Sequence, residues 1–393
     1  MRGSIVRRKR KDGTFADGYT IIVSYKDAQG KRRQVWKTYQ CNKPEAEKKL
    51  REMLTELDKG TFVHPGKETV REYLTRWLAD YCKPNLSPRT HELYRYMCDK
   101  HIIPSLGNIR LSELNVVHLQ HLYAEKLASG LSKRTVQLIH VTIHKALKSG
   151  VGSVLNYNVA ELLKDKPKAG RPEQHTMSEA DMHIFLDAAR GTEHYALFYV
   201  YLFTAMRRSE LLALTWDNVD LKLGQVSVTR TMQYLHSEPV DNRISFKQPK
   251  TLKSRRLISL TPSTVDVLIE HLATVKAKRK YLEMPEVTDK DLVFCHWDGT
   301  PFVPTSITRA WRRLADRTGF KGIRLHDARH SHASILLKQN VHPKVVQERL
   351  GHANIAITMD IYSHVMPGMQ QAAANKFDEA LGNSVSKPLA SST

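Results

Sequence analysis

The sequence contains few cysteines and no long apolar run. Its four cysteines, Cys41, Cys82, Cys98 and Cys295, are widely separated, and no two of them form a Cys-x-x-Cys pair. This pattern disfavours a zinc knuckle and a secreted disulfide framework, and it indicates reduced thiols. No apolar run approaches the length of a bilayer span, and the N-terminus lacks the apolar core of a signal peptide. We therefore expect a cytoplasmic protein without a membrane partner.

Acidic residues are also scarce relative to basic ones. The 393 residues include 61 lysines and arginines against 40 aspartates and glutamates, so the formal net charge is +21. The pI is about 9.7. Such a charge attracts a polyanion through phosphate contacts and counterion release, which makes nucleic acid the leading partner. A chain of this length predicts two or three domains, each with its own core.

The residue patterns predict a mainly α chain with small β elements, an α+β fold class. Residues 1–64 contain two alternating runs, 19–25 and 33–39, followed by Asn42 as an expected helix cap. They predict a three-stranded sheet plus one helix. A basic run precedes these strands and consists of Arg7, Arg8, Lys9, Arg10 and Lys11. Such a run is either a solvated terminus or a contact to nucleic acid.

Residues 65–165 have the apolar spacing of a bundle of four helices. Each expected helix begins at or near a capping residue, and these are Thr69, Ser87, Ser112 and Ser132. Lys133 and Arg134 open the fourth helix, where a phosphate is favoured, although both also fit as ordinary exposed charges. The Pro-, Gly- and Lys-rich stretch 166–174 is an expected linker.

Residues 175–393 are expected to form a mixed, mainly helical domain with a β insert at about 225–260 and an apolar-striped helix at 372–381. Arg207 should lie at the start of a helix with a buried apolar face, where Glu210 is a candidate salt-bridge partner. Arg208 points about 100° away around that helix, so we assign it to the DNA backbone or to solvent.

Five basic residues surround the turn after residue 246, so charge alone does not distinguish Lys250 from its competitor Lys253. Further on, His326 and Arg329 are three residues apart and share one face of an expected helix, where both can contact one phosphate. Two further histidines nearby raise a zinc alternative. It is disfavoured, because no acidic or thiol ligand follows at the spacing of a metal site.

The last candidates are His352, just beyond an expected helix that Gly351 ends, and Tyr362. Each residue alone has an ordinary structural explanation. Together with Arg207, His326 and Arg329 they form a set suited to attack on a phosphodiester. Guanidinium groups match the charged phosphate oxygens, and a tyrosine attacker conserves the bond energy in a phosphotyrosine.

With these residues the chain resembles the tyrosine recombinases, the phage-integrase-type site-specific recombinases. The shared pattern is an arginine, a lysine in a hairpin, His-x-x-Arg, Gly-His and a tyrosine, in family order. The resemblance covers essentially the whole chain, and residues 172–366 most strongly. One position departs from the pattern, because Ala205 stands where the family usually has glycine. Any requirement for a positive φ at this position is thereby in question.

The resemblance implies a recombinase or integrase of a phage or mobile element, acting near the nucleoid of a bacterial host. Tyr362 would attack the scissile phosphate, Arg207 and Arg329 would clamp its oxygens, His326 and His352 would assist proton transfer, and Lys250 would protonate the leaving 5′ oxygen. No metal or other cofactor is expected.

The same resemblance implies an arm-type DNA-binding domain in residues 1–64 and a core-type DNA-binding domain in residues 65–165. The implied partners are double-stranded DNA at core and arm attachment sites and other copies of the chain in a tetramer. A host DNA-bending protein and an excisionase are further candidates. Two alternatives remain open, a type IB topoisomerase with the same chemistry and a non-catalytic architectural DNA-binding protein.

Overall fold

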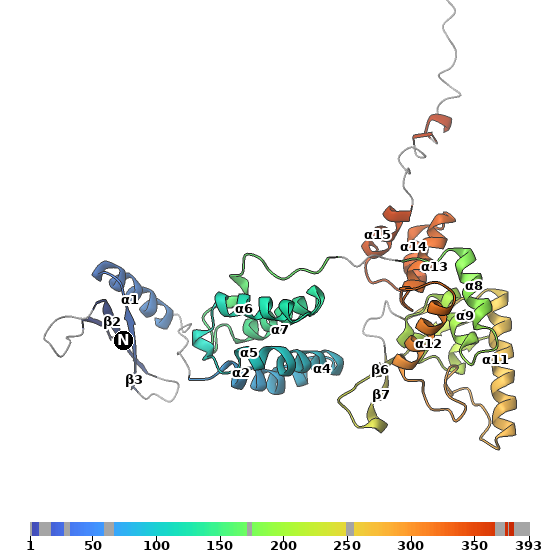
Figure 1. Cartoon of the computed structure of the whole chain (residues 1–393), viewed down its shortest axis with the longest axis horizontal. Helices are drawn as coiled ribbons and strands as arrows, with labels where there is room; N and C mark the ends of the chain where they lie inside the picture. The colour runs from blue at the N-terminus through green and yellow to red at the C-terminus, as the bar shows by residue number, and fades with distance from the viewer. Residues whose placement is uncertain are drawn as a thin grey trace, which may run out of the picture. The chain divides into compact units, whose positions relative to one another are not determined.

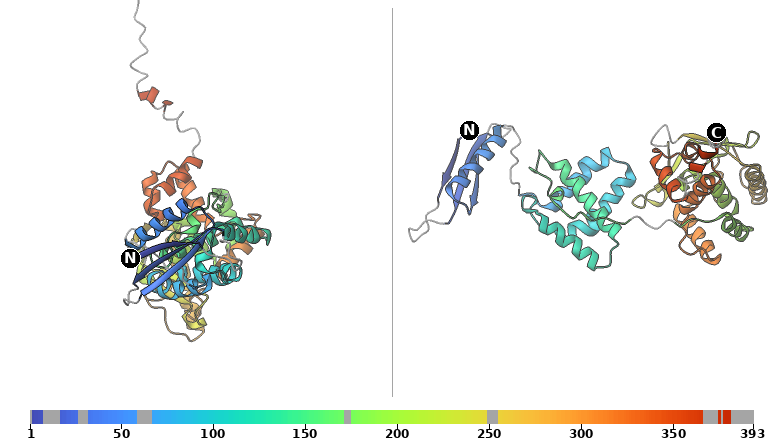
Figure 2. Two further views of the ribbon diagram at one scale, coloured as in Figure 1. Left: turned by 90° about the vertical axis from the view of Figure 1, so that its left-hand side faces the viewer. Right: turned by 90° about the horizontal axis from the view of Figure 1, so that it is seen from above.

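A computed structural model describes residues 2–7, 17–26, 32–58, 67–170, 175–248, 255–365, 374–375 and 377–380. The chain divides into two compact units, Met1–Arg171 and Pro172–Thr393 (Figures 1 and 2). This division falls inside the predicted linker 166–174. The predicted fold class, mainly α with small sheets, is confirmed. No helix within the described ranges is long and apolar enough to cross a membrane.

The N-terminal sheet has three antiparallel strands, β1 (Arg2–Val6), β2 (Tyr19–Lys26) and β3 (Arg32–Tyr39), followed by helix α1 (Lys43–Asp58). Asn42 caps α1 as predicted, because its Oδ1 accepts from the Glu45 N–H at 3.0 Å. A small apolar core lies between sheet and helix and contains Ile21, Val23, Val35 and Met53. Arg7 is exposed directly after β1, whereas the predicted contacts Arg8, Lys9, Arg10 and Lys11 lie outside the described residues.

A helical bundle completes the first unit. Its elements are α2 (Val70–Arg76), η1 (Trp77–Cys82), α3 (Lys83–Asn85), α4 (Pro88–Met97), η2 (Cys98–Ile102), α5 (Ile103–Leu106), η3 (Leu111–Glu113), α6 (Val116–Ala128), α7 (Lys133–Gly150) and η4 (Val159–Glu161). Thr69, Ser87 and Ser132 cap their helices as predicted. The prediction for the third helix is wrong, since α6 begins after Asn115, whose Oδ1 accepts from the His118 N–H. Ser112 instead lies in the short η3 turn.

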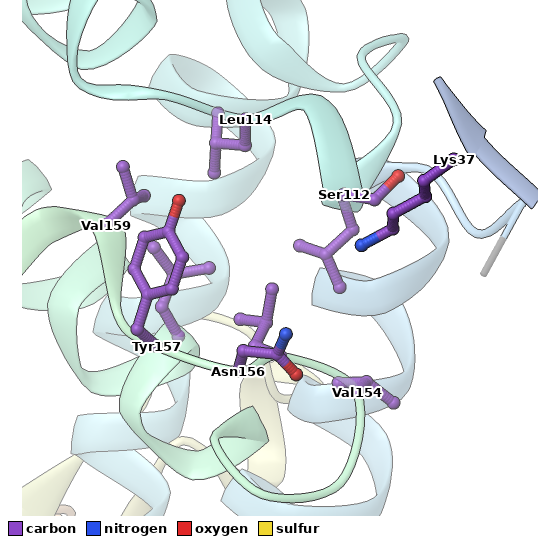
Figure 3. A pocket seen from close by; sticks show the side chains of 10 residues that line it. Lys37, Ser112, Leu114, Val154, Asn156, Tyr157 and Val159 are labelled. Carbon is purple, nitrogen blue, oxygen red and sulfur yellow. The ribbon is translucent and has the colours of Figure 1, made fainter. Parts of the chain in front are cut away.

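Lys133 and Arg134 are exposed in the first turn of α7, as the sequence predicts. A pocket of about 200 Å³ lies elsewhere in the first unit, and Leu114, Tyr157 and Val159 are among its lining residues (Figure 3). None of the predicted site residues lines this pocket. The predicted catalytic residues all lie in the second unit.

The second unit is mainly helical, and its first helix begins after the predicted cap Ser178. Its helices are α8 (Glu179–Ala189), α9 (Tyr195–Thr204), α10 (Arg208–Leu211), η5 (Trp216–Asn218), η6 (Val240–Asn242), α11 (Pro262–Tyr281), α12 (Pro304–Arg317), α13 (Asp327–Lys338), α14 (Pro343–Leu350) and α15 (Ala356–Val365). Phe185, Phe198, Tyr201 and Trp311 pack together in its main core. Burial of such large side chains is the main source of stability for this arrangement.

The predicted β insert is present. Strands β4 (Val219–Asp220), β5 (Gln225–Val228) and β8 (Arg256–Ser259) form one antiparallel sheet, and β6 (Thr231–Tyr234) pairs with β7 (Ile244–Lys247) in a second. Within the first sheet, Val226 pairs with Ile258. The turn that carries Lys250 and Lys253 lies outside the described residues.

Helices α13, α14 and α15 lie side by side in Figure 1 and enclose a second, smaller apolar core. Ala205, Leu337, Val346, Leu350 and Ile361 belong to this core. It joins the end of α9 to the three helices that carry the histidine, arginine and tyrosine candidates. Of the predicted helix 372–381, residues 374–375 and 377–380 are helical and the others lie outside the described residues.

Candidate active site

Arg207 stands at the start of α10 and is held there by Glu210. The Arg207 backbone N–H donates to Glu210 Oε2 at 2.9 Å, and its Nη1 donates to Oε1 at 2.7 Å. The predicted salt bridge is therefore present. The Glu210 side chain is only 4% exposed, whereas that of Arg207 is 37% exposed. The buried carboxylate thus fixes the guanidinium on its protein-facing side, and part of the guanidinium stays open to a ligand.

Ala205 ends α9 in the left-handed region, with φ 50° and ψ 32°. Its carbonyl oxygen accepts from Arg329 Nη1 at 2.6 Å, although the two residues are 124 positions apart in the chain. The positive φ that glycine favours is therefore adopted by an alanine. This conformation costs an L-residue about 1–2 kcal/mol, and here it directs a backbone acceptor at the second arginine.

We expect Ala205→Gly to raise the free energy of unfolding by about 1 kcal/mol, because glycine enters the left-handed region without steric cost. Cleavage of DNA should change little, since the acceptor for Arg329 is a main-chain carbonyl. Urea unfolding of the two proteins measures the difference. Ala277→Gly, in the interior of α11 and exposed, is the matched control and should lower stability by about 1 kcal/mol. Equal destabilisation by both changes would contradict the prediction.

His326 and Arg329 lie at the N-terminal end of α13, with His326 as the N-cap residue. His326 is exposed, whereas Arg329 is only 2% exposed. Arg329 Nη2 donates to the Leu350 carbonyl oxygen, which complements its bond to Ala205. Two backbone carbonyls from distant parts of the chain thus orient this guanidinium. A guanidinium has five N–H groups, so these contacts use only part of its donor capacity.

Three arginines converge on the carbonyl end of α14. Arg329 bonds to the Leu350 carbonyl, Arg207 Nη2 donates to the Gly351 carbonyl at 2.7 Å, and Arg256 Nε donates to the Arg349 carbonyl at 2.8 Å. The last carbonyls of a helix lack partners within the helix and carry its partial negative charge. They therefore satisfy and position three cations that would otherwise repel one another.

His352 follows Gly351, which ends α14 in the left-handed region with φ 66°, as the sequence predicts. The His352 Nδ1 is 3.0 Å from Thr358 Oγ1, and Thr358 is fully buried in α15. Tyr362 lies in the same helix, about one turn after Thr358. The hydrogen bond therefore links the predicted histidine to the helix that contains the predicted nucleophile.

The two histidines are uncharged at neutral pH. Burial lowers the pKa of His352 to about 3, and the charges of Arg329 and Arg207 act in the same direction. Partial desolvation of its ring, together with the nearby charges of His330 and Arg329, also lowers the pKa of His326. The pKa of Arg329 is lowered by burial and by nearby arginines, but a guanidinium keeps its proton at neutral pH. The arginines therefore supply charge, and the neutral imidazoles can donate or accept hydrogen bonds.

Arg208 was predicted to face solvent or the DNA backbone, but the structure places it against another helix. It is partly buried, and its Nη1 donates to the Pro304 carbonyl at 3.2 Å and to Thr308 Oγ1 at 2.5 Å. The reason is that its side chain lies against the first turn of α12. These contacts favour a structural role, and contact with DNA by Arg208 stays a prediction.

The histidines near Arg329 also have defined positions. His332 is packed between helices, since its Nδ1 lies 2.9 Å from the Leu202 carbonyl and its Nε2 accepts from Arg349. Burial lowers its pKa to about 4. The His330 ring meets the His326 ring edge to face, with centroids 5.2 Å apart. In the described part of the chain, no group of three or more potential ligands could hold a metal ion.

Arg256 is the residue that the sequence did not single out. It counted only as one of five basic residues around the turn at Lys250. In the structure its Nη2 donates to Glu210 Oε2 at 2.8 Å, so the buried carboxylate is shared by two arginines. The sequence offers one signal for Arg256, which is its position at the start of the short apolar strand β8. That signal is weak without knowledge of the partner.

Two family profiles match the chain: "Phage integrase family" over residues 175–368 and "Phage integrase, N-terminal SAM-like domain" over residues 69–127. The integrase of Streptomyces ambofaciens is 32% identical over 337 residues, which cover 84% of this chain and 85% of that protein. The profile over residues 175–368 includes all six predicted catalytic positions.

Solved structures show the same fold. A Tn1549 transposon integrase fragment in complex with transposon right end DNA has a TM-score of 0.67 and 18% identity, covering 80% of this chain and 99% of the other. A lambda integrase tetramer bound to a Holliday junction has a TM-score of 0.57 and 15% identity, covering 90% and 93%. At these identities the likeness concerns the fold alone.

Proposed function

Because the chain belongs to the phage integrase family of tyrosine recombinases, we propose that the site around Arg207, Arg329 and His352 cleaves and rejoins DNA with Tyr362 as nucleophile. The protein is a site-specific recombinase, an enzyme of integration and excision. The proposal concerns which of its residues perform each step. The observation that carries it is the fixed pair of guanidiniums beside the turn that contains His352.

In the proposed cleavage step, the Tyr362 hydroxyl oxygen attacks the scissile phosphorus and the 5′ oxygen leaves. A 3′-phosphotyrosine forms, and Lys250 gives a proton to the leaving oxygen. Rejoining reverses these roles, as a 5′ hydroxyl from another strand displaces the tyrosine. The ester bond energy is retained throughout, so neither step needs a nucleotide cofactor.

Arg207 and Arg329 would stabilise the negative charge that develops on the non-bridging oxygens. Their positions support this role, since each is held by backbone carbonyls or by Glu210 before any DNA arrives. Preorganised donors are effective because little reorganisation is needed during the reaction. His326 and His352, both neutral, would exchange the tyrosine proton or hydrogen-bond the phosphate.

Trapping on a suicide duplex tests the proposed function. A nick near the cleavage position lets the short fragment with the free 5′ hydroxyl diffuse away. Rejoining is then prevented, so a covalent protein–DNA adduct accumulates. Suitable duplexes span the ends of the element that contains the gene. An adduct excludes a pure DNA-binding protein, and exchange between two duplexes excludes a topoisomerase acting on one duplex. If neither adduct nor exchange forms on any end sequence, the proposal is wrong.

We expect a substrate with a 5′-bridging phosphorothiolate to restore cleavage by Lys250→Ala. Its thiolate leaves without a proton, so a missing general acid no longer matters. Arg207→Ala should stay inactive on this substrate, because its defect concerns charge rather than proton donation. Gel analysis of adduct formation on both substrates measures the rescue. Rescue of Lys253→Ala in place of Lys250→Ala would transfer the role to Lys253.

We propose that the N-terminal sheet binds arm sites on duplex DNA and that the helical bundle binds the core site. Arg7 at the end of β1 and Trp36, 56% exposed on β3, support a contact surface in the sheet. Lys133 and Arg134 at the exposed start of α7 support a contact surface in the bundle.

Removing residues 1–64 should abolish salt-sensitive binding to arm duplexes while core cleavage persists. Unchanged arm binding would contradict this.

The proposed assembly is a tetramer on DNA, in keeping with the lambda integrase tetramer on a Holliday junction. We further propose action at the nucleoid in the cytoplasm of a bacterial host, where the substrate is found. A host DNA-bending protein and an excisionase remain candidate partners, since direction control requires factors beyond the catalytic site.

A further inference from the structure

Arg256 occupies a buried position where three elements of the site meet. It is the first residue of β8, and its side chain is only 7% exposed. Its Nη2 donates to Glu210 Oε2 on α10, and its Nε donates to the Arg349 carbonyl on α14, each at 2.8 Å. A single side chain therefore connects β8, α10 and α14.

The carboxylate of Glu210 transmits this connection to Arg207. Oε1 accepts from Arg207 Nη1, whereas Oε2 accepts from both the Arg207 backbone N–H and Arg256 Nη2. Burial alone would raise the pKa of Glu210, but hydrogen bonds and charge from Arg256 and Arg207 lower it overall. Without Arg256 this buried carboxylate would keep its bonds to Arg207 but lose a cationic partner on Oε2 that helps to fix its orientation.

Arg256 also packs against the turn that precedes His352. A Cβ atom built on Gly351 would lie 3.0 Å from Arg256 Nη1 and 3.1 Å from its Cδ. The turn thus has glycine for two reasons, the positive φ of 66° and the close approach of Arg256. The Gly351 carbonyl is the acceptor for Arg207 Nη2. Arg256 therefore borders both anchors of Arg207.

We propose that Arg256 is a positioning residue for DNA cleavage. Through Glu210 it holds Arg207 in the orientation that binds the scissile phosphate, and through α14 it holds the turn that presents His352. The inference rests on the proposed role of Arg207. It requires no contact between Arg256 and DNA.

The test compares Arg256→Ala and Arg256→Lys with wild type in single-turnover cleavage of the suicide duplex. A misplaced catalytic group commonly costs about 10²-fold in rate, so Arg256→Ala should lose about that factor. The dissociation constant for the duplex should change less than about threefold. Arg256→Lys retains one donor and should lose less. Arg279→Ala is the matched control, because Arg279 is similarly buried and pairs with Asp291 at 2.8 Å away from the site.

All variants are measured at a temperature where thermal melting shows each to be folded. The control should then cleave at close to the wild-type rate, even if its melting temperature falls. If Arg256→Ala does not fold, Arg256→Lys alone decides, with a rate loss of at least about tenfold expected. A rate equal to that of the control would overturn the inference.

Two further readouts separate positioning from a general structural role. A methylphosphonate at the scissile position removes one charged oxygen, so it should shrink the cleavage defects of both Arg207→Ala and Arg256→Ala. The loss in the double variant should be smaller than the two single losses combined, because Arg256 acts in part through Arg207. Additive losses, or an equal defect on both substrates, would contradict action through Arg207. Absence of an adduct with wild type would instead refute the proposed function.

Discussion

Tyr362→Phe should abolish formation of the covalent adduct and leave the affinity for DNA nearly unchanged. The substitution removes the nucleophilic oxygen and keeps the aromatic ring, so packing in α15 should be preserved. The hydroxyl of the neighbouring Thr358 does not offer a substitute attacker, because it is fully buried and engaged with His352. The expected loss is complete within the limit of detection, because without the phosphotyrosine the reaction has no intermediate.

The measurement pairs adduct formation on a suicide duplex with a binding titration on the same duplex. Tyr281→Phe is a matched control, since Tyr281 at the end of α11 is 84% exposed and lies outside the site. It should behave as wild type in both assays. An adduct from Tyr362→Phe would refute the assignment of the nucleophile. Loss of binding together with the adduct would show that the change had damaged α15.

Arg329→Lys should reduce the rate of cleavage by about 10²- to 10³-fold, the usual effect of removing one preorganised donor. Two nitrogens of Arg329 reach the Ala205 and Leu350 carbonyls, which are supplied by different parts of the chain. A lysine keeps the charge, but its single nitrogen cannot reproduce this planar fork or present two donors to a phosphate. Binding of DNA should fall by less than about threefold, because the lysine keeps the positive charge.

Single-turnover rates and dissociation constants on one duplex separate the two effects. Arg279→Lys, which alters a buried ion pair away from the site, is the control and should leave the rate unchanged. Equal losses in rate and in affinity for Arg329→Lys would point to an ordinary backbone contact. Loss of stability alone would be visible in thermal melting and would affect both variants.

Several features could be read from the sequence because they depend on neighbours along the chain. Capping residues such as Ser132 and Ser178 mark helix starts through contacts to backbone groups a few residues away. Gly351 marks the end of α14 for the same local reason. The order of Arg207, His326, Arg329, His352 and Tyr362 was likewise readable, since the chemistry of the residue types limits what such a set can do. Where local signals compete, as between Ser112 and Asn115, the prediction was wrong.

Only the tertiary structure decided how these residues meet. Arg207 bonds to a carbonyl 144 positions away, and Arg256 to one 93 positions away, distances at which no periodicity carries information. The sequence only raised the question of a positive φ at Ala205, and the structure answered it, because alanine by itself disfavours the left-handed conformation. From the helical angle alone, Arg208 was assigned to solvent or the DNA backbone. Packing against α12 determined its contacts instead. Sequence therefore determined the chemical groups and the local turns, whereas packing of α9, α13 and α14 determined which groups share one site.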